Sequence, residues 1–342
     1  MKNSLFTFVV LLTLFACKNE TKSTETKAET KSTITKKEIK APSDVIPFMD
    51  KWKILLGDGT KSEDLLGFQK DGFFYVETEN ETDWVVYKTP NSGITSKTSS
   101  NTRTELGEKK HWIPEEGGKL TGTLKVKHVS TTGDATKSSA FSVVVGQIHS
   151  GEGHENEPLK IYYKKFPGHT KGSVFWNYEI NTKGDNAGRW DYSTAVWGND
   201  FSKVGKDATT APNEPVDGIA LDEEFSYEVN VYKGIMYLTF TSEGHETVTF
   251  TKSLIKTDFP TKASIPQQII DSYLSRRKVS EEREIAYDGE INYFKQGAYN
   301  QANVKTGSKI YEGDIAKQYE NGSYAEVWFK TATVGEATAP KK

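Results

Sequence analysis

The sequence is poor in the residues that build disulfide frameworks, and it has no long apolar run. Its 342 residues include a single cysteine, Cys17, and three methionines. One cysteine cannot form a disulfide within the chain, so the fold must rest on packing and hydrogen bonding. The apolar run from Leu5 to Phe15 is too short to cross a bilayer as a helix.

An excess of either charge is also missing. The 44 Lys and Arg residues and the 47 Asp and Glu residues give a formal net charge of −3, so bulk electrostatics does not recruit nucleic acid. The six histidines show no H-E-x-x-H or comparable ligand spacing, and we predict no metal and no cofactor. The E-x-D-x-x-E string, which places the paired carboxylates of a glycoside hydrolase on one strand, is absent as well.

Aromatic residues, by contrast, are abundant. The chain has 17 Phe, 16 Tyr and seven Trp, a composition that favours sheets over helical bundles. Short runs between turn residues predict an all-β fold, a jelly-roll β-sandwich with one short helix and long loops. The helix is expected at Ser264 to Arg277, and Lys233-Gly234 should form a hairpin turn. The main strands are expected at residues 72–79, 84–88, 120–128, 140–149, 172–180, 225–232, 235–241, 247–251, 291–301 and 324–330.

One connection is unusually long. Residues Asn181 to Gly218 are rich in Gly, Asp, Asn, Thr and Pro, yet they contain Trp190, Tyr192 and Trp197. Long loops within a domain are usually functional or disordered, and the aromatic residues argue against disorder. We therefore expect a structured cap.

The two ends of the chain differ from the middle. Residues 1–17 have the pattern of a lipoprotein-type signal peptide, in which Leu14-Phe15-Ala16-Cys17 resembles a bacterial lipobox and Cys17 is the lipidation site. Residues 18–43 predict a disordered tether, 44–333 the folded domain, and 334–342 a flexible tail. We expect an exported monomer, held in the cell envelope by its lipid, or else secreted.

Three short stretches carry polar residues at alternate positions. They are R-T-E-L at Arg103–Leu106, Q-I-H at Gln147–His149, and Y-F-K-Q-G-A-Y-N-Q at Tyr293–Gln301. On a strand, alternate residues share a face, so the last stretch should present Tyr293, Lys295, Gly297, Tyr299 and Gln301 together. Strict alternation would place Gln147 and His149 with buried valines unless Gly146 introduces a bulge. Taken singly, each stretch is as compatible with a structural role as with a functional one.

Together, the three stretches resemble the motifs of the alginate lyases of polysaccharide lyase family 7. The family carries R-(S/T)-E-(L/V)-R, Q-(I/V)-H and Y-F-K-x-G-x-Y-x-Q, and the similarity covers roughly Trp52 to Phe329. The third motif matches at every specified position, whereas Gly107 stands where the family has its second arginine. The resemblance implies a jelly roll with a concave substrate groove.

The resemblance also implies a chemistry. Alginate is cleaved by β-elimination, in which a base removes the C5 proton beside a carboxylate and the C4 oxygen leaves. Arg103 and Gln147 would neutralise that carboxylate. His149 would act as base on guluronate, and Tyr299 would protonate the leaving oxygen, or serve as both base and acid on mannuronate. These four are the predicted catalytic residues.

Further residues are predicted to bind substrate, and other functions stay open. The binding set is Glu105, Tyr293, Lys295, Gln301, Trp190 and Trp197, with Glu105 expected to orient Arg103. Q-I-H resembles the guluronate-active members, and a groove closed at one end would favour exolytic cleavage. The alternatives are a non-catalytic carbohydrate-binding surface lipoprotein and a lyase acting on another polyuronate.

Overall fold

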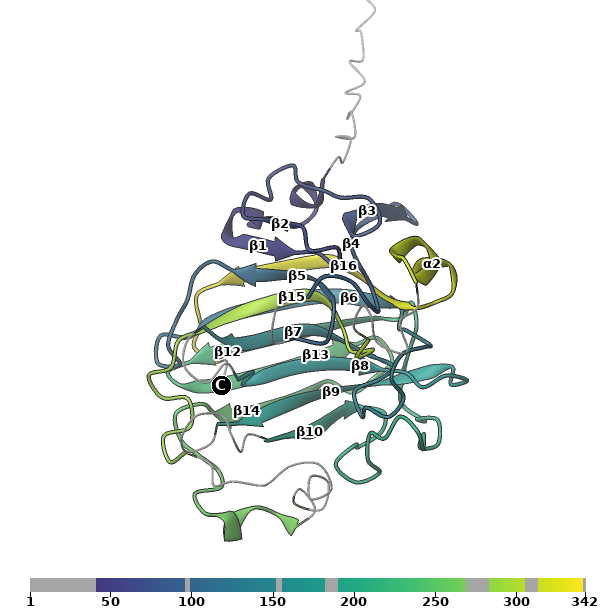
Figure 1. Cartoon of the computed structure of the whole chain (residues 1–342). Helices are drawn as coiled ribbons and strands as arrows, with labels where there is room; N and C mark the ends of the chain where they lie inside the picture. The colour runs from purple at the N-terminus through teal and green to yellow at the C-terminus, as the bar shows by residue number, and fades with distance from the viewer. Residues whose placement is uncertain are drawn as a thin grey trace, which may run out of the picture. The chain divides into compact units, whose positions relative to one another are not determined.

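Two antiparallel sheets, packed face to face, make up most of the computed structural model (Figure 1). It describes residues 41–95, 99–151, 156–181, 190–267, 270, 283–304 and 313–340. The first sheet has the strand order β10-β9-β8-β7-β15-β5-β1-β2, with β11 paired to β9, and the second has β14-β13-β12-β6-β16-β4-β3. The predicted all-β jelly-roll sandwich is therefore confirmed.

The strand bounds are as follows. In the first sheet they are β1 (Trp52–Leu55), β2 (Lys61–Ser62), β5 (Arg103–Glu108), β7 (Ser142–Ser150), β8 (Leu159–Lys164), β9 (Lys171–Ile180), β10 (Trp190–Trp197), β11 (Ile219–Ala220) and β15 (Asn292–Asn300). In the second they are β3 (Phe74–Glu79), β4 (Thr82–Pro90), β6 (Gly118–His128), β12 (Glu224–Tyr232), β13 (Ile235–Ser242), β14 (Val248–Ser253) and β16 (Tyr324–Gly335). The helical elements are η1 (Pro42–Asp44), η2 (Met49–Lys51), η3 (Lys262–Ser264) and α2 (Ile315–Glu320).

The core lies between the sheets. Phe294, Ile148 and Leu106 from the first sheet and Leu124 and Leu238 from the second are almost completely buried in one cluster. Because alternate residues of a strand face opposite ways, burying these side chains turns their neighbours toward the outer face of the first sheet. That face carries the polar residues of the three motifs.

Each strand predicted from the sequence is present, with its ends shifted by a few residues. The turn at Lys233 and Gly234 is also confirmed, since both residues have positive φ (51° and 76°) between β12 and β13. Strand β8 and helix α2 were missed.

The prediction of one unbroken connection at 181–218 is wrong. Residues Trp190–Trp197 form β10, which pairs antiparallel with β9 at the edge of the sheet. The alternation of W-D-Y-S at its start and its aromatic and β-branched residues favour this strand. Residues 198–218 form a loop beside the outer face. Near its start, the Asn199 N–H donates to the Ser173 hydroxyl of β9.

The predicted tail begins too early, and the predicted tether runs slightly too far. Strand β16 continues to Gly335, and the backbone N–H of Thr338 donates to the Asn230 side chain at 3.0 Å. At the other end, Ala41 is already buried. Both corrections come from backbone hydrogen bonds and packing that composition does not report.

Two predictions concern residues outside the described ranges. The helix expected at Ser264–Arg277 is described only at 264–267 and 270, where the Ile270 N–H donates to the Pro266 carbonyl at 3.2 Å. The signal peptide and most of the tether, residues 1–40, are not described. Within the described part of the chain, no helix combines the length and apolar character needed to cross a membrane.

Candidate active site

The three motifs lie on neighbouring strands. Strand β15 runs between β5 and β7, so the longest motif is flanked on each side by one of the others (Figure 1). The register pairs are Tyr293 with His149, Lys295 with Gln147 and with Gly107, and Tyr299 with Arg103. Residues far apart in sequence are thus brought into one patch.

A bulge in β7 gives Gln147 and His149 their direction. The register with β8 slips between Val144 and Gly146, so one residue of β7 is extra at this point. Val145 and Ile148 both pack in the core between the sheets, which leaves Gln147 and His149 on the outer face. The structure therefore has the bulge at Gly146 that an outward-facing Gln147 and His149 require.

A second irregularity shapes β15. Gly297 has φ of +141°, and a Cβ placed there would be 2.6 Å from the Thr104 carbonyl oxygen. Only glycine combines this backbone with so close an approach. The register with β7 slips between Gln296 and Tyr299, whereas the register with β5 is unbroken and sets Tyr299 opposite Arg103.

Glu105 is the buried centre of the site. The residue is 3% exposed. Its carboxylate pairs with Lys295 Nζ at 2.8 Å and with Arg103 Nη1 at 3.3 Å. It also accepts a hydrogen bond from Gln147 Nε2. Burial raises the pKa of Glu105, but the positive charges of Lys295 and Arg103 outweigh burial and hold this pKa below its usual value. Glu105 therefore pairs with both cations from a buried position.

Arg103 in turn contacts Tyr299. The guanidinium carbon lies 3.8 Å from the centroid of the Tyr299 ring, and Nη2 donates to Ser99 Oγ at 3.2 Å. The Tyr299 hydroxyl lies 3.2 Å from the same Ser99 Oγ. Arg103 Nε is buried and has no hydrogen-bond partner among the described residues, so one donor of this cation is unused.

His149 is held as a neutral imidazole. Burial, followed by the nearby Lys295 charge, lowers its pKa to about 4. Nδ1 lies 2.6 Å from the Ser150 carbonyl oxygen, so Nδ1 carries the proton and Nε2 keeps its lone pair. Nε2 lies 3.4 Å from Glu157 Oε1, which would stabilise the ring once it had accepted a second proton.

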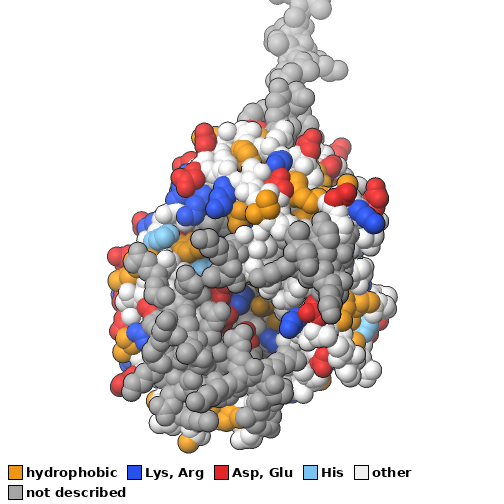
Figure 2. Space-filling model, viewed as in Figure 1, with side chains coloured by type: hydrophobic (Ala, Val, Ile, Leu, Met, Phe, Trp, Pro, Cys, Tyr) orange, Lys and Arg blue, Asp and Glu red, His pale blue; other side chains and the backbone are white. Residues whose placement is uncertain are grey.

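Two cavities meet at Tyr299. The β2-side cavity, about 550 Å³, is lined by β1, β2 and the three motif strands. The β10-side cavity, about 500 Å³, is lined by β8, β9, β10 and the loop at 201–207. Ser99, Glu157 and Tyr299 line both. Acidic and basic side chains gather at the floor of the hollow on this face (Figure 2).

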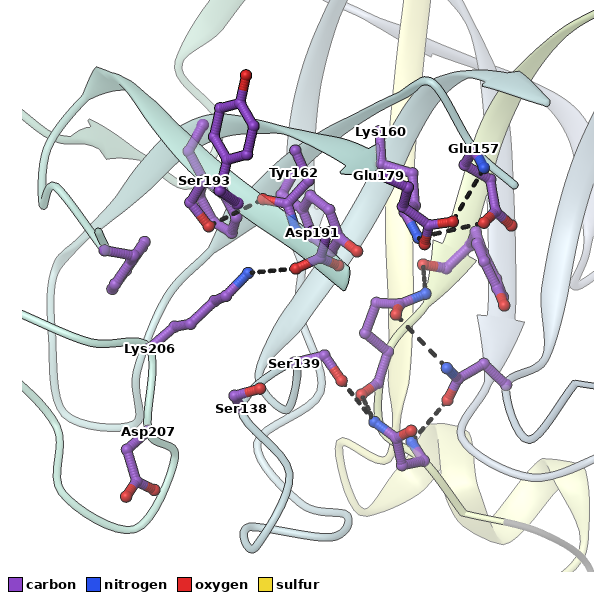
Figure 3. A pocket seen from close by; sticks show the side chains of 18 of the residues that line it. Ser138, Ser139, Glu157, Lys160, Tyr162, Glu179, Asp191, Ser193, Lys206 and Asp207 are labelled. Carbon is purple, nitrogen blue, oxygen red and sulfur yellow. Dashed lines mark hydrogen bonds and ion pairs between the residues drawn. The ribbon is translucent and has the colours of Figure 1, made fainter. Parts of the chain in front are cut away.

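The cavities differ in charge. The β2-side cavity has four basic residues, Lys53, Lys61, Arg103 and Lys295, against three carboxylates, Glu63, Glu105 and Glu157. The β10-side cavity has four carboxylates, Glu157, Glu179, Asp191 and Asp207, against Lys160 and Lys206. Figure 3 shows Lys206 directed at Asp191 and Lys160 beside Glu179 and Glu157; Lys160 Nζ is 3.4 Å from Glu157 Oε2.

The predicted binding residues have different fates. Lys295 and Tyr293 line the β2-side cavity, and Gln301 lines the β10-side cavity. Gln147 is fully buried behind Glu105 and lines neither cavity. Tyr293 stacks between His111 and His149, with ring centroids 5.0 and 5.3 Å apart, so it positions the histidine.

Of the two tryptophans predicted to bind substrate, the structure contradicts Trp197 and does not test Trp190. Trp197 is 3% exposed, its Nε1 donates to the Glu246 carbonyl at 2.9 Å, and it packs on Phe225 and Phe240. It cannot stack on a sugar, so predicting it as a binding residue was wrong. The side chain of Trp190 lies outside the described part of the chain.

Sequence reasoning missed Ser99, Lys53, Lys160 and a role for Glu157 beside His149. None belongs to a motif, and each reaches the site only through folding.

The described residues contain no group of three or more His, Cys, Asp or Glu side chains placed to hold a metal ion. What the site can do is bind an anionic group beside an imidazole and a phenol.

Comparisons with known proteins agree on one family. A family model described as alginate lyase matches residues 46–336. An alginate lyase of Klebsiella pneumoniae is 30% identical over 269 residues, which are 69% of this chain and 73% of that protein. The crystal structure of an exolytic family 7 alginate lyase from Zobellia galactanivorans is 70% identical, with a TM-score of 0.83 over 88% of this chain and 99% of its own. The crystal structure of the Klebsiella pneumoniae alginate lyase shares the fold at 24% identity, with a TM-score of 0.61 over 87% of this chain and 99% of its own.

Proposed function

The chain belongs to the alginate lyases of polysaccharide lyase family 7, and we propose that it removes sugars from one end of an alginate chain by β-elimination. The observation that carries the proposal is the convergence of Arg103, His149 and Tyr299 around one hollow. Each offers a group that the elimination needs, namely a cation for the carboxylate, a neutral base and a phenol.

Arg103 neutralises the carboxylate of the reacting sugar. The C5 proton is weakly acidic because its loss would put a second negative charge beside that carboxylate, and a fixed cation lowers this cost. Arg103 lines the β2-side cavity and its side chain is 12% exposed, so its guanidinium can reach a bound uronate. Gln147, which the sequence predicted to act on the same carboxylate, is buried away from both cavities, and its amide instead holds Glu105.

His149 takes the C5 proton of guluronate through Nε2. With its pKa at about 4, the imidazole is unprotonated at neutral pH, as a base must be. Tyr299 gives its phenolic proton to the departing C4 oxygen, and on mannuronate it also removes the C5 proton. Lys295, Tyr293 and Gln301 complete the binding surface. A guluronate preference stays a prediction, because Ile148 of Q-I-H points into the core.

The exolytic mode rests on two observations. The 70% identical structure is that of an exolytic enzyme. In addition, the β10-side cavity has four carboxylates against two lysines, whereas the β2-side cavity has four basic residues against three carboxylates. Like charges repel, so a polyuronate would extend along the β2 side and leave only a short end beyond Tyr299.

The test is to mix the purified protein with alginate and follow ultraviolet absorbance of the conjugated unsaturated uronate, while chromatography identifies the earliest products. Unsaturated monomers from the first minutes are expected. No absorbance with alginate or other polyuronates at several pH values would contradict the lyase function. Long oligomers as first products would contradict only the exolytic mode. Substrate binding without turnover would favour the non-catalytic carbohydrate-binding alternative.

We also propose that the protein acts outside the cytoplasm, attached through a lipid on Cys17. The support is the sequence alone, which places a lipobox-like Leu14-Phe15-Ala16-Cys17 after an apolar run and before a Ser, Thr, Lys and Glu-rich segment. Such a segment gives the lyase domain reach toward a polymer too large to enter the cell. We also propose that the protein is a monomer.

A further inference from the structure

Gly107 leaves a gap in the wall of the β2-side cavity. It lies on β5 with Lys53 of β1 opposite on one side and Lys295 of β15 opposite on the other. A Cβ at Gly107 would be 3.7 Å from Lys53 Cε, 3.8 Å from Lys53 Cγ and 3.7 Å from the Tyr293 ring. These are ordinary van der Waals distances. The Lys53 side chain therefore lies across the space that a side chain at position 107 would occupy.

Lys53, like the exposed Lys61, differs from the other two cations of this cavity. Arg103 and Lys295 are paired with the buried Glu105, whereas no described residue forms an ion pair or hydrogen bond with the Lys53 ammonium. Lys53 is also exposed, while Lys295 is buried. An unpaired ammonium at a cavity wall attracts an anionic group of a ligand without first giving up a partner.

We propose that Lys53 binds the carboxylate of the uronate next to the reacting sugar, on the β2 side of Tyr299, and thereby takes the place of a cation at position 107. The proposal rests on the alginate lyase function. Lys53 touches no reacting atom, so it contributes equally to the ground state and the transition state. Its loss should raise KM and leave kcat nearly unchanged.

The structure allows a charge-relocation experiment. Gly107 does not have positive φ, and a Cβ there would make only ordinary contacts, so arginine fits there once the Lys53 side chain is shortened. The variants are Lys53→Ala, Lys53→Arg and the double variant Lys53→Ala with Gly107→Arg. The control is Lys256→Ala, because Lys256 is equally exposed but lies outside both cavities. Steady-state kinetics on alginate oligosaccharides is measured at low and high salt.

Lys53→Ala should raise KM about tenfold at low salt, and the difference should shrink at high salt because salt screens exposed charges. Lys53→Arg should stay near the parent, and the double variant should recover most of the loss. An unchanged KM in Lys53→Ala, or a rise in KM no larger than that of Lys256→Ala, would overturn the proposal while the lyase function stood. A double variant that folds, by its circular dichroism and melting temperature, yet shows no recovery would also overturn it. Failure of the parent protein to form unsaturated products would instead remove the function on which the proposal rests.

Discussion

The phenol of Tyr299 is held by few contacts, and this makes its chemistry separable from its structural role. Its hydroxyl lies 3.2 Å from Ser99 Oγ, and its ring lies under the Arg103 guanidinium. Tyr299→Phe keeps the ring and removes only the proton donor. We expect kcat to fall by about 10²- to 10⁴-fold with little change in substrate binding, which is the usual range for loss of a general acid or base.

The matched control is Tyr319→Phe. Its hydroxyl donates to the Gly72 carbonyl at 2.8 Å, and it lines neither cavity, so this variant should lose a hydrogen bond without losing activity. Initial rates from ultraviolet absorbance and substrate binding by calorimetry provide the comparison. A Tyr299→Phe enzyme of parental kcat would show that another group protonates the leaving oxygen.

His149 predicts a dependence of stability on pH. Its pKa is about 4 in the folded chain and near 6.5 as a free side chain, so between these values the unfolded chain binds more protons. Stability from this group is complete above pH 6.5 and is lost as the pH falls through about 4. A shift of this size corresponds to roughly 3 kcal/mol in the free energy of unfolding.

Urea unfolding at pH 7 and at about pH 4 measures this effect. The parent protein should lose more stability on acidification than His149→Gln does, because the variant lacks this titrating group and shares all the others. Equal losses in the two proteins would mean that the pKa of His149 in the folded chain is close to 6.5. The imidazole would then be protonated at mildly acidic pH and could not act as a base there.

At the scale of the element, the two strand irregularities decide where the chemistry points. Gly297 has φ of +141°, and a Cβ there would approach the Thr104 carbonyl oxygen at 2.6 Å and Glu105 Cα at 3.0 Å. Gly297→Ala therefore combines backbone strain with a clash against β5. We expect a loss of about 3 kcal/mol in the free energy of unfolding and a large loss of activity, since β5 carries Arg103.

Gly168→Ala separates strain from crowding. Gly168 also has positive φ (86°), but a Cβ there would have nothing within 4 Å. It should cost only about 1 kcal/mol, with full activity. Urea unfolding of both variants makes the comparison. If both lost the same stability, the close approach of β5 to β15 would not be what excludes a side chain at 297.

The elements that the sequence predicted were those with a visible pattern. Strand β6 alternates between buried and more exposed residues, and its pattern predicted it directly. Strand β8 was missed because all six of its residues are buried, so no alternation marks it. The face of β15 was predicted well, whereas the face of β7 depended on a bulge that Gly146 made possible without requiring it.

At the scale of the molecule, the site combines motif residues with residues that no motif contains. The three motifs predicted Arg103, His149 and Tyr299 through their resemblance to those of the family, and the sheet order brings the three residues together. Lys53 and Glu157 reach the same hollow from β1 and from the residues before β8. Their roles depend on which strands become neighbours, and a single sequence does not contain that information.

The last prediction concerns how the whole chain is held in place. The compact unit spans Ile39–Lys342, and the site lies wholly within it, so Cys17 should affect location without affecting catalysis. In a bacterium that processes lipoproteins, the parent protein should sediment with membranes and incorporate labelled fatty acid. Cys17→Ser should remain in the soluble fraction with unchanged kcat and KM, whereas Ser23→Ala, in the same segment, should behave like the parent. Parent protein that is soluble and unlabelled would contradict the anchor, because the thiol of Cys17 is the single site in this chain to which the lipid could be attached as a thioether.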